Sequence, residues 1–316
     1  MKLPKSEREK LKHADIRAYQ PALDTLSSHA VIQNLAPSTR TNYLSNAKRF
    51  FAYLTVYRKG VPMEEVTYED CRAFVLYHVQ YGMEPRTINT YISTMVKLFY
   101  CVRHDRFNNC EVPYQKTEKH LPSVITTSVF TALYAVCESS FEKALICFLF
   151  CTGMRISELL ACRFCDINRA ELKVYVGPSK GRHDRYTLLS EKALQVLEGF
   201  YRDLYGFHTK ASSDWYVFAK QAPDGNYMPI TYYDARKVML RLTEKANLQG
   251  KGYTLHSFRH GFATELYRNT NNLVLLAELL GHRSLNATRI YVELAAIDYV
   301  HDNHISNPLD SVVFEI

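Results

Sequence analysis

The feature that divides this chain is a polar stretch near its middle. Residues 105–120 are polar and contain Asn108, Asn109 and Pro113. Asparagine and proline favour turns over regular elements, so we predict a linker over residues 109–120. The 316 residues exceed the ~150 residues typical of one domain and suggest two. The predicted parts are an N-terminal arm at 1–35, a first domain at 36–108 and a second domain at 121–316 that ends in a tail at 295–316.

Apolar residues recur at helical spacing on both sides of this linker. After Pro37, with Ser38 as the expected N-cap, the apolar positions of one helical face begin at Tyr43 and continue to Leu54. Further helices are expected at 67–81, after Pro85, from about 128, from about 141, and at 155–162, 190–205, 231–248, 254–269, 272–280 and 284–300. Strand-like segments at 172–176 and 185–189 flank a turn and predict a hairpin. The predicted fold class is mainly α, with an N-terminal helical bundle and a small β-hairpin in the second domain.

Composition excludes several classes of protein. The chain has 47% hydrophobic and 22% charged residues, values that exclude a disordered or collagen-like chain. Its formal charge of +7 permits a polyanionic partner without requiring one. No apolar run reaches the ~18–20 residues of a membrane span, and no apolar signal sequence follows the charged N-terminus. The pair Cys162 and Cys165 has no second pair or histidine at zinc-finger spacing. We therefore expect a cytoplasmic protein with free thiols, no metal site and no membrane partner.

Two motifs place cationic side chains at the start of a predicted helix, a position that can bind an anion. Arg155 begins a predicted helix just after Gly153, and its simplest interpretation is an ion pair with Glu158, three residues further on. His256 and Arg259 are also three residues apart, so both project from one face at the start of a helix. A helix N-terminus that carries such cations is suited to hold a phosphate.

Three further residues gain weight only from their positions. His282 follows Gly281, which is placed to end a helix. Ser284 is a suitable N-cap for the next predicted helix, on which Tyr291 lies two turns along. Lys180 lies in the predicted hairpin turn, where a solvated lysine is the simplest interpretation. Tyr291 is one of 23 tyrosines and would mean nothing alone.

The order and spacing of these residues together resemble the signature of the tyrosine recombinase (phage integrase) family, in its simple two-domain, Xer-like form. A lone HxxR is weak evidence, whereas six positions in order are specific. The six positions are Arg155, Lys180, His256, Arg259, His282 and Tyr291, and the matching contexts are 152–159, 256–264, 280–284 and 290–291. The resemblance covers most of the chain. It implies a helical core-binding domain at 36–108 and a catalytic domain at 121–316.

The resemblance also implies a role for each position. In this family a tyrosine, here Tyr291, attacks a DNA phosphodiester and forms a 3′-phosphotyrosyl link, which frees a 5′-hydroxyl. His256 matches the general base, and Lys180 would protonate the leaving 5′-oxygen. The remaining positions match as follows: Arg155 and Arg259 would bracket the phosphate oxygens, His282 would donate a further hydrogen bond, and Glu158 would orient a neighbouring cation.

Partners and cofactors follow from the same resemblance. Two domains suit a clamp around duplex DNA, and contacts to phosphate make such binding salt-sensitive. Candidate DNA contacts are Arg40, Lys48, Arg86 and Lys97, for which solvated surface charges are an equal interpretation. The family implies a homo-tetramer on DNA, a C-terminal tail exchanged between protomers, accessory directionality proteins, and a place at the nucleoid. No carboxylate cluster for two metals and no glycine-rich phosphate loop is present, so we expect no cofactor.

Other interpretations remain beside this one. A catalytically silent DNA-binding relative is disfavoured because every catalytic position is filled. A type IB topoisomerase or telomere resolvase is disfavoured by the compact size and by the nine-residue spacing from His282 to Tyr291. Within the family, integration or excision of a mobile element and Xer-like resolution of chromosome dimers both stay open. The N-terminal extension favours the mobile element.

Overall fold

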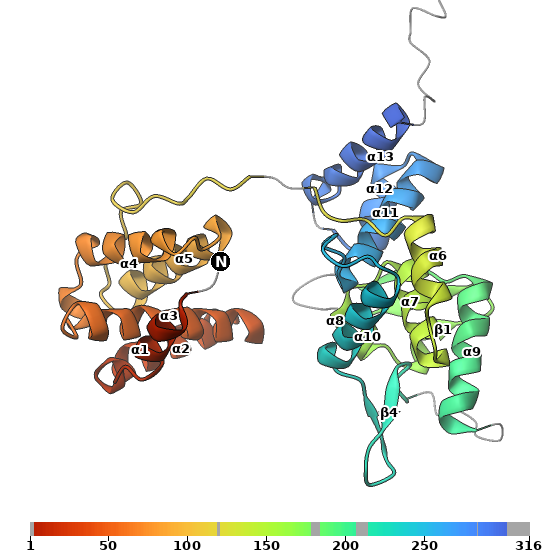
Figure 1. Ribbon diagram of the computed structural model, residues 1–316, viewed down its shortest axis with the longest axis horizontal. Helices are drawn as coiled ribbons and strands as arrows, with labels where there is room; N and C mark the ends of the chain where they lie inside the picture. The colour runs from red at the N-terminus through yellow and green to blue at the C-terminus, as the bar shows by residue number, and fades with distance from the viewer. Residues whose placement is uncertain (1–2, 119–120, 178–183, 207–213, 283, 302–316) are drawn as a thin grey trace, which may run out of the picture. The chain divides into compact units, whose positions relative to one another are not determined.

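The structure is a computed structural model that describes residues 3–118, 121–177, 184–206, 214–282 and 284–301, with side chains described as far as Ala295. The chain forms two compact units, Met1–Lys119 and His120–Ile316 (Figure 1). The boundary falls at the end of the linker expected over 109–120. Each unit has a hydrophobic core of its own.

Unit 1 is a helical bundle. Its elements are α1 (Lys5–Lys12), a 3-10 turn at Arg17–Tyr19, α2 (Gln20–Ile32), α3 (Pro37–Tyr57), a 3-10 turn at Met63–Glu65, α4 (Tyr68–Gln80) and α5 (Pro85–Cys101). Helix α4 begins where its sequence dictates, because Thr67 and Asp70 form a capping box. Phe50 and Phe51 of α3 and Ile92 of α5 are almost fully buried in one core. Packing of these apolar faces, rather than helix propensity, stabilises the bundle.

The N-terminal segment corrects two of our expectations. Residues 1–35 were expected as an arm, but within them α2 packs against α3 and α5 and buries Leu23 and Leu26. Tyr19 stacks on Phe51 with ring centroids 4.3 Å apart. The apolar stripe at 19, 22, 23, 26 and 30 was overlooked because charged residues dominate the first seventeen positions. Ser38 is not an N-cap either, since Pro37 is already the first residue of α3.

The carboxylate of Glu7 joins helix α1 to the rest of the bundle through hydrogen bonds. Glu7 accepts hydrogen bonds from Tyr57, from the Tyr77 hydroxyl at 2.8 Å and from the Lys10 ammonium at 2.9 Å. The hydrogen bond from Tyr57, followed by those from Lys10 and Tyr77, lowers the pKa of Glu7 to about 2. The carboxylate therefore stays ionised at neutral pH and keeps its three donors.

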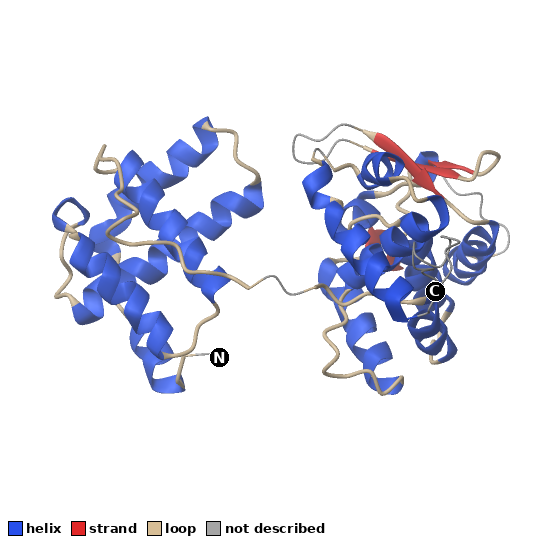
Figure 2. Cartoon of the chain, turned by 90° about the horizontal axis from the view of Figure 1, so that it is seen from above, coloured by secondary structure: helices blue, strands red, loops and turns tan. Residues whose placement is uncertain are grey.

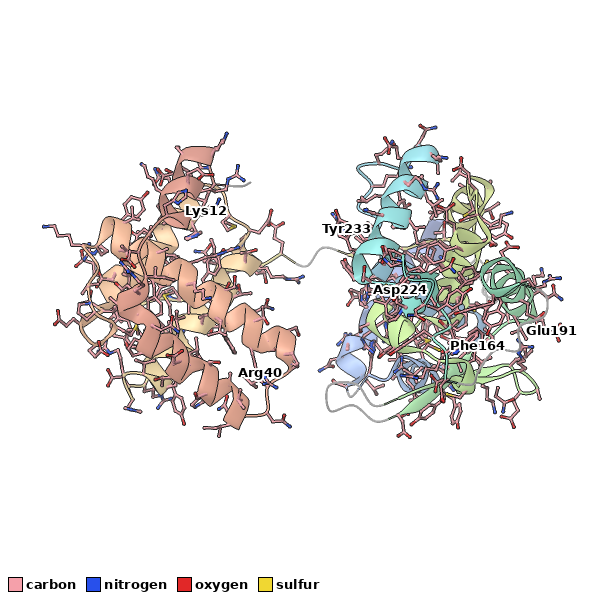
Figure 3. All side chains as sticks on the ribbon, turned by 90° about the horizontal axis from the view of Figure 1, so that it is seen from below. Lys12, Arg40, Phe164, Glu191, Asp224 and Tyr233 are labelled. Atoms are coloured by element: carbon pink, nitrogen blue, oxygen red, sulfur yellow. The ribbon has the colours of Figure 1, made fainter. Side chains whose placement is uncertain are left out.

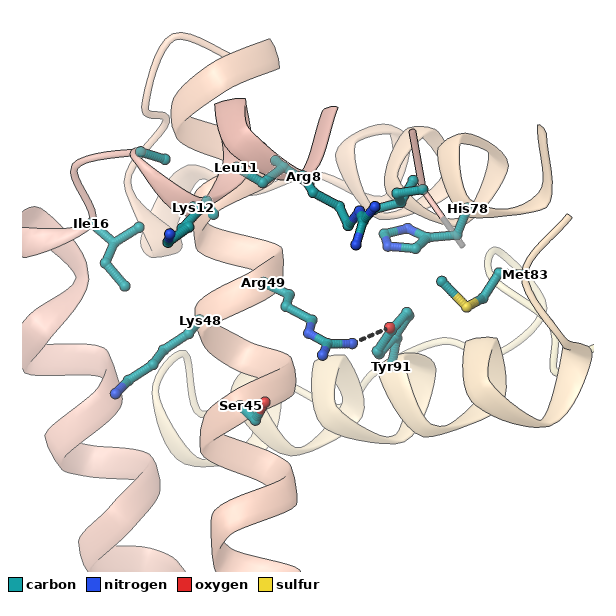
Figure 4. Close-up of a pocket in the computed structure, with 13 residues that line it drawn as sticks. Arg8, Leu11, Lys12, Ile16, Ser45, Lys48, Arg49, His78, Met83 and Tyr91 are labelled. Atoms are coloured by element: carbon teal, nitrogen blue, oxygen red, sulfur yellow. Dashed lines mark hydrogen bonds between the residues drawn. The ribbon is translucent and has the colours of Figure 1, made fainter. Parts of the chain in front are cut away.

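A pocket of about 790 Å³ lies between α1 and the rest of unit 1 (Figure 4). Its charged lining residues are Arg8, Lys12, Lys48 and Arg49, and Arg49 donates a hydrogen bond to the Tyr91 hydroxyl at 2.8 Å. Lys48, one of the predicted DNA contacts, thus lines this cationic pocket.

Unit 2 is mainly helical with small antiparallel sheets, which confirms the predicted fold class (Figure 2). Its helices are α6 (Thr127–Ala135), α7 (Ser140–Thr152), α8 (Ile156–Ala161), α9 (Glu191–Tyr205), α10 (Tyr232–Lys245), α11 (Leu255–Thr270), α12 (Leu273–Leu280) and α13 (Arg289–His301), with 3-10 turns at Phe164–Asp166 and Leu285–Ala287. Its strands are β1 (Ile167–Asn168), β2 (Lys173–Val176), β3 (Arg185–Leu188), β4 (Ala219–Gln221) and β5 (Tyr227–Pro229). No helix among the described residues is long and apolar enough to cross a membrane.

The predicted hairpin is formed by β2 and β3. These strands pair antiparallel, with Val174 opposite Thr187 and Val176 opposite Arg185, and β1 pairs with the other edge of β2. A second small sheet, β4 with β5, was not foreseen in the sequence. The turn between β2 and β3, with Lys180, lies outside the described residues.

Helix α7 is the centre of the core of unit 2, and it packs against α9 and α11. Ser139 caps its N-terminus, and its apolar residues Leu145, Phe148 and Leu149 are fully buried.

The start of the last helix corrects another expectation. Ser284 caps the 3-10 turn at Leu285–Ala287 through the backbone N–H of Asn286, so α13 begins only at Arg289. Tyr291 therefore lies in the first turn of α13.

Candidate active site

The C-terminal end of α12 gathers arginines from three segments of the described chain. The last carbonyls of a helix have no partner within it, and the negative end of the helix dipole attracts cations. The Leu279 carbonyl accepts from Arg185 Nε at 2.8 Å. The Leu280 carbonyl accepts from Arg259 Nη2 at 2.6 Å and from Arg155 Nη1 at 3.4 Å. A short helix thus sets the relative positions of these cations.

Glycines at the ends of α7 and α12 make this close packing possible. Gly281 has φ +64°, and a Cβ there would approach the Arg185 side chain to 3.0 Å. Gly153 has φ +59°, and a Cβ there would overlap the ring of Phe262. Because Gly153 ends α7, its carbonyl is free to accept from Arg259 Nη1 at 2.8 Å. Arg259 therefore joins the ends of two helices.

Arg259 is a buried cation, with only 1% of its surface exposed. Burial, and then the charge of Arg155, lowers its pKa to about 9, so it remains positively charged at neutral pH. Its Nη2 lies 3.1 Å from His282 Nε2, and because arginine only donates, Nε2 is the acceptor. The neutral His282 ring then carries its proton on Nδ1, which lies 2.8 Å from Thr288 Oγ1.

Glu158 is the counter-charge of the arginine cluster. Its carboxylate accepts from Arg155 Nη1 at 2.8 Å and from the backbone N–H of Arg155 at 2.9 Å. Arg185 binds both carboxylate oxygens, at 3.2 and 2.7 Å. Burial alone would raise the pKa of Glu158, but the hydrogen bonds from Arg185 and Arg155 and their charges outweigh it and bring the pKa to about 2. The ion pair expected between Arg155 and Glu158 is present, and Arg185 extends it.

The variant Glu158→Gln is expected to lose about 3–5 kcal/mol of unfolding free energy at pH 7, because it leaves buried guanidinium groups without a counter-charge. The pKa of Glu158 is lower in the folded chain than the ordinary 4.5. The carboxylate therefore stabilises the fold above about pH 4.5, and this contribution is lost as the pH falls towards about 2. Urea titrations from pH 7 down to pH 3 should show the difference between variant and wild type shrinking.

Glu198→Gln is the matched control, since Glu198 makes an exposed ion pair with Arg169 at 3.0 Å. We expect it to change the unfolding free energy by less than about 1 kcal/mol. Equal losses for the two variants would contradict a special role for the buried carboxylate.

Tyr291 lies beside the arginine cluster in the core between α11, α12 and α13. Only 2% of its surface is exposed, and its hydroxyl lies 3.2 Å from His260 Nδ1. Its ring is nearly parallel to that of His282, with centroids 6.4 Å apart. Burial raises the pKa of Tyr291, whereas the charges of Arg259 and Arg155 act in the opposite direction. The hydroxyl is thus protonated at neutral pH and lies in the field of two arginines.

Two histidines lie one turn apart on α11. The rings of His256 and His260 meet edge to face with centroids 4.7 Å apart. Loss of hydration, and then the charges of Arg259 and Arg155, lowers the pKa of His256. Burial, and then the charges of His256 and Arg259, lowers the pKa of His260 to about 4. Both rings are therefore mainly neutral at pH 7.

The structure brings most of the predicted site residues together. Five of them lie around the end of α12 and the start of α11 or contact residues there, namely Arg155, Arg259, His256, His282 and Tyr291. Glu158 lies beside them. Lys180 lies outside the described residues. Sequence reasoning missed Arg185, His260 and Thr288. A signal existed for His260, which is four residues after His256 and so shares its helix face.

The four predicted DNA contacts lie in different surroundings in unit 1. Arg40, near the start of α3, donates to the Leu35 carbonyl at 2.6 Å (Figure 3). Lys97 donates to Gln33 Oε1 at 2.8 Å, and Arg86 is exposed. Their roles in DNA binding stay predictions.

All eight cysteines are free thiols. Across the described ranges, no three histidine, cysteine, aspartate or glutamate side chains are grouped so that they could hold a metal ion.

A helical bundle followed by a unit in which arginines, histidines and a tyrosine converge is the architecture of a tyrosine recombinase. Residues 123–296, more than half of the chain, match the Phage integrase family, and residues 23–104 match the Phage integrase, N-terminal SAM-like domain. The chain belongs to the phage integrase family. It is thus a tyrosine recombinase, a class of enzymes that cleave and rejoin DNA.

The chain is also similar to known relatives in sequence and to solved structures in fold. The chain is 28% identical over 289 residues to tyrosine recombinase XerD of Chlorobaculum tepidum, covering 87% of this chain and 92% of that protein. It is 28% identical over 296 residues to tyrosine recombinase XerC of Psychromonas ingrahamii, covering 90% and 94%. Its fold is similar to that of the Tn1549 transposon integrase in complex with transposon right end DNA, with a TM-score of 0.66, 20% identity and coverage of 90% and 99%. XerH bound to its difH substrate is similar too, with a TM-score of 0.61, 23% identity and coverage of 82% and 78%.

Proposed function

We propose that this protein is a site-specific DNA recombinase that cleaves and rejoins duplex DNA through a 3′-phosphotyrosyl intermediate on Tyr291. The observation that carries the proposal is the position of the Tyr291 hydroxyl, which is buried beside Arg259 and within the field of Arg155. Two fixed arginines suit a phenolic nucleophile that attacks a phosphate, because their charges favour the phenolate and neutralise the charge that develops on the phosphate.

The arginines would stabilise the charge that develops on the scissile phosphate. A guanidinium has five N–H donors, and the contacts of Arg259 with Gly153, Leu280 and His282 use three of them. Donors therefore remain for a phosphate oxygen and for the tyrosine. Because Glu158 and the carbonyls of α12 fix these cations in advance, little reorganisation is needed when DNA binds.

Bond making and breaking then balance without a cofactor. The Tyr291 oxygen loses its proton and bonds to phosphorus, while the bond from phosphorus to the 5′-oxygen breaks and that oxygen takes a proton. The neutral ring of His256 is suited to receive the first proton. We assign the second proton transfer to Lys180, following the resemblance. The phosphotyrosyl bond retains the energy of the diester, so a 5′-hydroxyl can reverse the step without ATP.

Exchange between two duplexes requires each of four strands to be cut once, and one Tyr291 serves one strand. We therefore propose that four protomers assemble on two DNA sites, with the tail at 295–316 docked on a neighbouring protomer. The site sequence decides whether the reaction integrates or excises a mobile element or resolves chromosome dimers. Both uses employ the same chemistry.

The proposal is tested by trapping the intermediate. Duplexes that bind the protein selectively are first recovered from a random pool, then nicked near the presumed cleavage position so that the short cleaved strand diffuses away. We expect an SDS-resistant protein–DNA adduct in the presence of EDTA and without nucleotide. Tryptic mass spectrometry should place the nucleotide on the peptide that contains Tyr291.

Selective binding without any adduct in EDTA, on a duplex that the protein demonstrably recognises, would favour a DNA-binding relative without catalysis. An adduct that requires Mg²⁺ would overturn the metal-independent mechanism. A heterologous duplex of the same length serves as the control and should give no adduct.

A further inference from the structure

We propose that His260 is a positioning residue for the nucleophile: its neutral Nδ1 accepts the hydrogen bond of the Tyr291 hydroxyl and thereby turns a lone pair of that oxygen towards the phosphate. The inference rests on the proposed role of Tyr291 as nucleophile. It starts from the 3.2 Å separation of His260 Nδ1 and Tyr291 Oη, a contact between α11 and the first turn of α13.

The direction of this hydrogen bond follows from the neighbours of the hydroxyl. A phenol has one proton to donate and two lone pairs that accept. Arg259, which also interacts with this hydroxyl, can only donate. Among the contacts in the described part of the chain, His260 Nδ1 is the partner that can accept the tyrosine proton. The neutral ring then carries its own proton on Nε2.

Burial suits His260 to a lasting acceptor role. A protonated imidazole has no lone pair on nitrogen and could not accept the tyrosine proton. Loss of hydration at this half-buried position, together with the neighbouring charge of Arg259, keeps the ring neutral at pH 7. Its low pKa makes His260 a poor base. As attack proceeds, the hydroxyl proton therefore leaves this hydrogen bond and is taken up by His256, the proposed general base. The two histidines on one helix face thus have separate tasks.

Orientation of the hydroxyl matters because the O–H bond of tyrosine rotates easily. Attack needs a lone pair aligned with phosphorus, and a proton pointing there would block it. With the proton held by His260 and the positive charge of Arg259 close to the oxygen, the lone pairs stay free of the proton and one can face phosphorus. The resting site is therefore arranged for attack before DNA arrives.

Two variants of His260 separate this role from simple packing. In His260→Asn, the side-chain amide oxygen replaces Nδ1 at the same distance from the backbone and can still accept the hydrogen bond. In His260→Leu, the volume is kept and no acceptor remains. The measurement is the single-turnover rate of adduct formation at saturating DNA, together with the Kd for the same duplex and the thermal unfolding midpoint of each protein.

We expect His260→Leu to form the adduct about 10–100-fold more slowly with a Kd within about twofold of wild type, since orientation acts on the reacting oxygen and not on DNA binding. His260→Asn should recover to within about threefold of wild type. The defect of the leucine variant should persist on DNA with a 5′-bridging phosphorothiolate, whose sulfur leaves without protonation, because the nucleophile and not the leaving group is affected. His13→Leu, a change at an exposed histidine of α1's C-terminal end, is the control.

A wild-type rate for His260→Leu would overturn the proposal, and so would an asparagine variant as slow as the leucine variant. Both outcomes are distinct from failure of the proposed function. In that case the wild-type protein itself would form no adduct, or the adduct would map to a residue other than Tyr291.

Discussion

The variant Tyr291→Phe is expected to form no covalent adduct with DNA, a loss of at least about 10³-fold in cleavage. The change removes only the hydroxyl oxygen, and the ring keeps its place in the core with Phe262 and Leu276. Loss of the hydrogen bond to His260 should change the unfolding free energy by no more than about 1 kcal/mol. The Kd for a recognised duplex, measured by fluorescence anisotropy, should stay within about twofold of wild type.

Tyr267→Phe is the matched control for this experiment. Tyr267 packs against the same core cluster from α11, and the variant should cleave DNA at the wild-type rate. An adduct that persists in Tyr291→Phe would identify a different tyrosine as the nucleophile. Loss of DNA binding together with the adduct would show that the hydroxyl is needed for recognition instead.

The sequence predicted the helices well where their start signals are local. Thr67 and Asp70 encode the start of α4, and Pro85 fixes the start of α5, so both helices lie where expected. The prediction failed where tertiary packing decides. Residues 1–35 as a whole look mildly basic and surface-like, yet the apolar side chains of α2 within them complete the core of unit 1. Ser284 looks like the cap of a long helix, but it caps a single 3-10 turn.

The site was predictable from the sequence only in part. The pairs Arg155–Glu158 and His256–Arg259 could each be predicted from a three-residue spacing at the start of a helix. The structure brings the two pairs close to one another. Arg185 gave no such signal. It meets Glu158 of α8 across 27 positions of sequence, because the start of β3 lies beside α8 and beside the end of α12. A long-range ion pair of this kind depends on topology, which residue spacing does not encode.

The variant Arg259→Lys is expected to lose both catalysis and stability. A lysine keeps the positive charge but has a single nitrogen, so it cannot reach the carbonyls of Gly153 and Leu280 and the ring of His282 together. Adduct formation should fall by about 10²–10³-fold, as when one fixed donor to a transition-state oxyanion is removed. Buried carbonyls left without a donor should cost about 1–3 kcal/mol of unfolding free energy.

Arg268→Lys is the control, because it replaces an arginine by a lysine outside the site. Arg268 is on the same helix α11 and pairs with Glu265 at 2.9 Å near the surface, so this variant should cleave at the wild-type rate and lose less than about 1 kcal/mol. Cleavage is compared at a temperature where urea titration shows all three proteins to be folded, so that a slower rate reflects the site and not unfolded enzyme. If Arg259→Lys cleaves normally while it is destabilised, Arg259 only joins the ends of α7 and α12, and Arg155 must carry the charge stabilisation. If both properties fall, one buried guanidinium holds the helices together and presents the remaining donors to the phosphate.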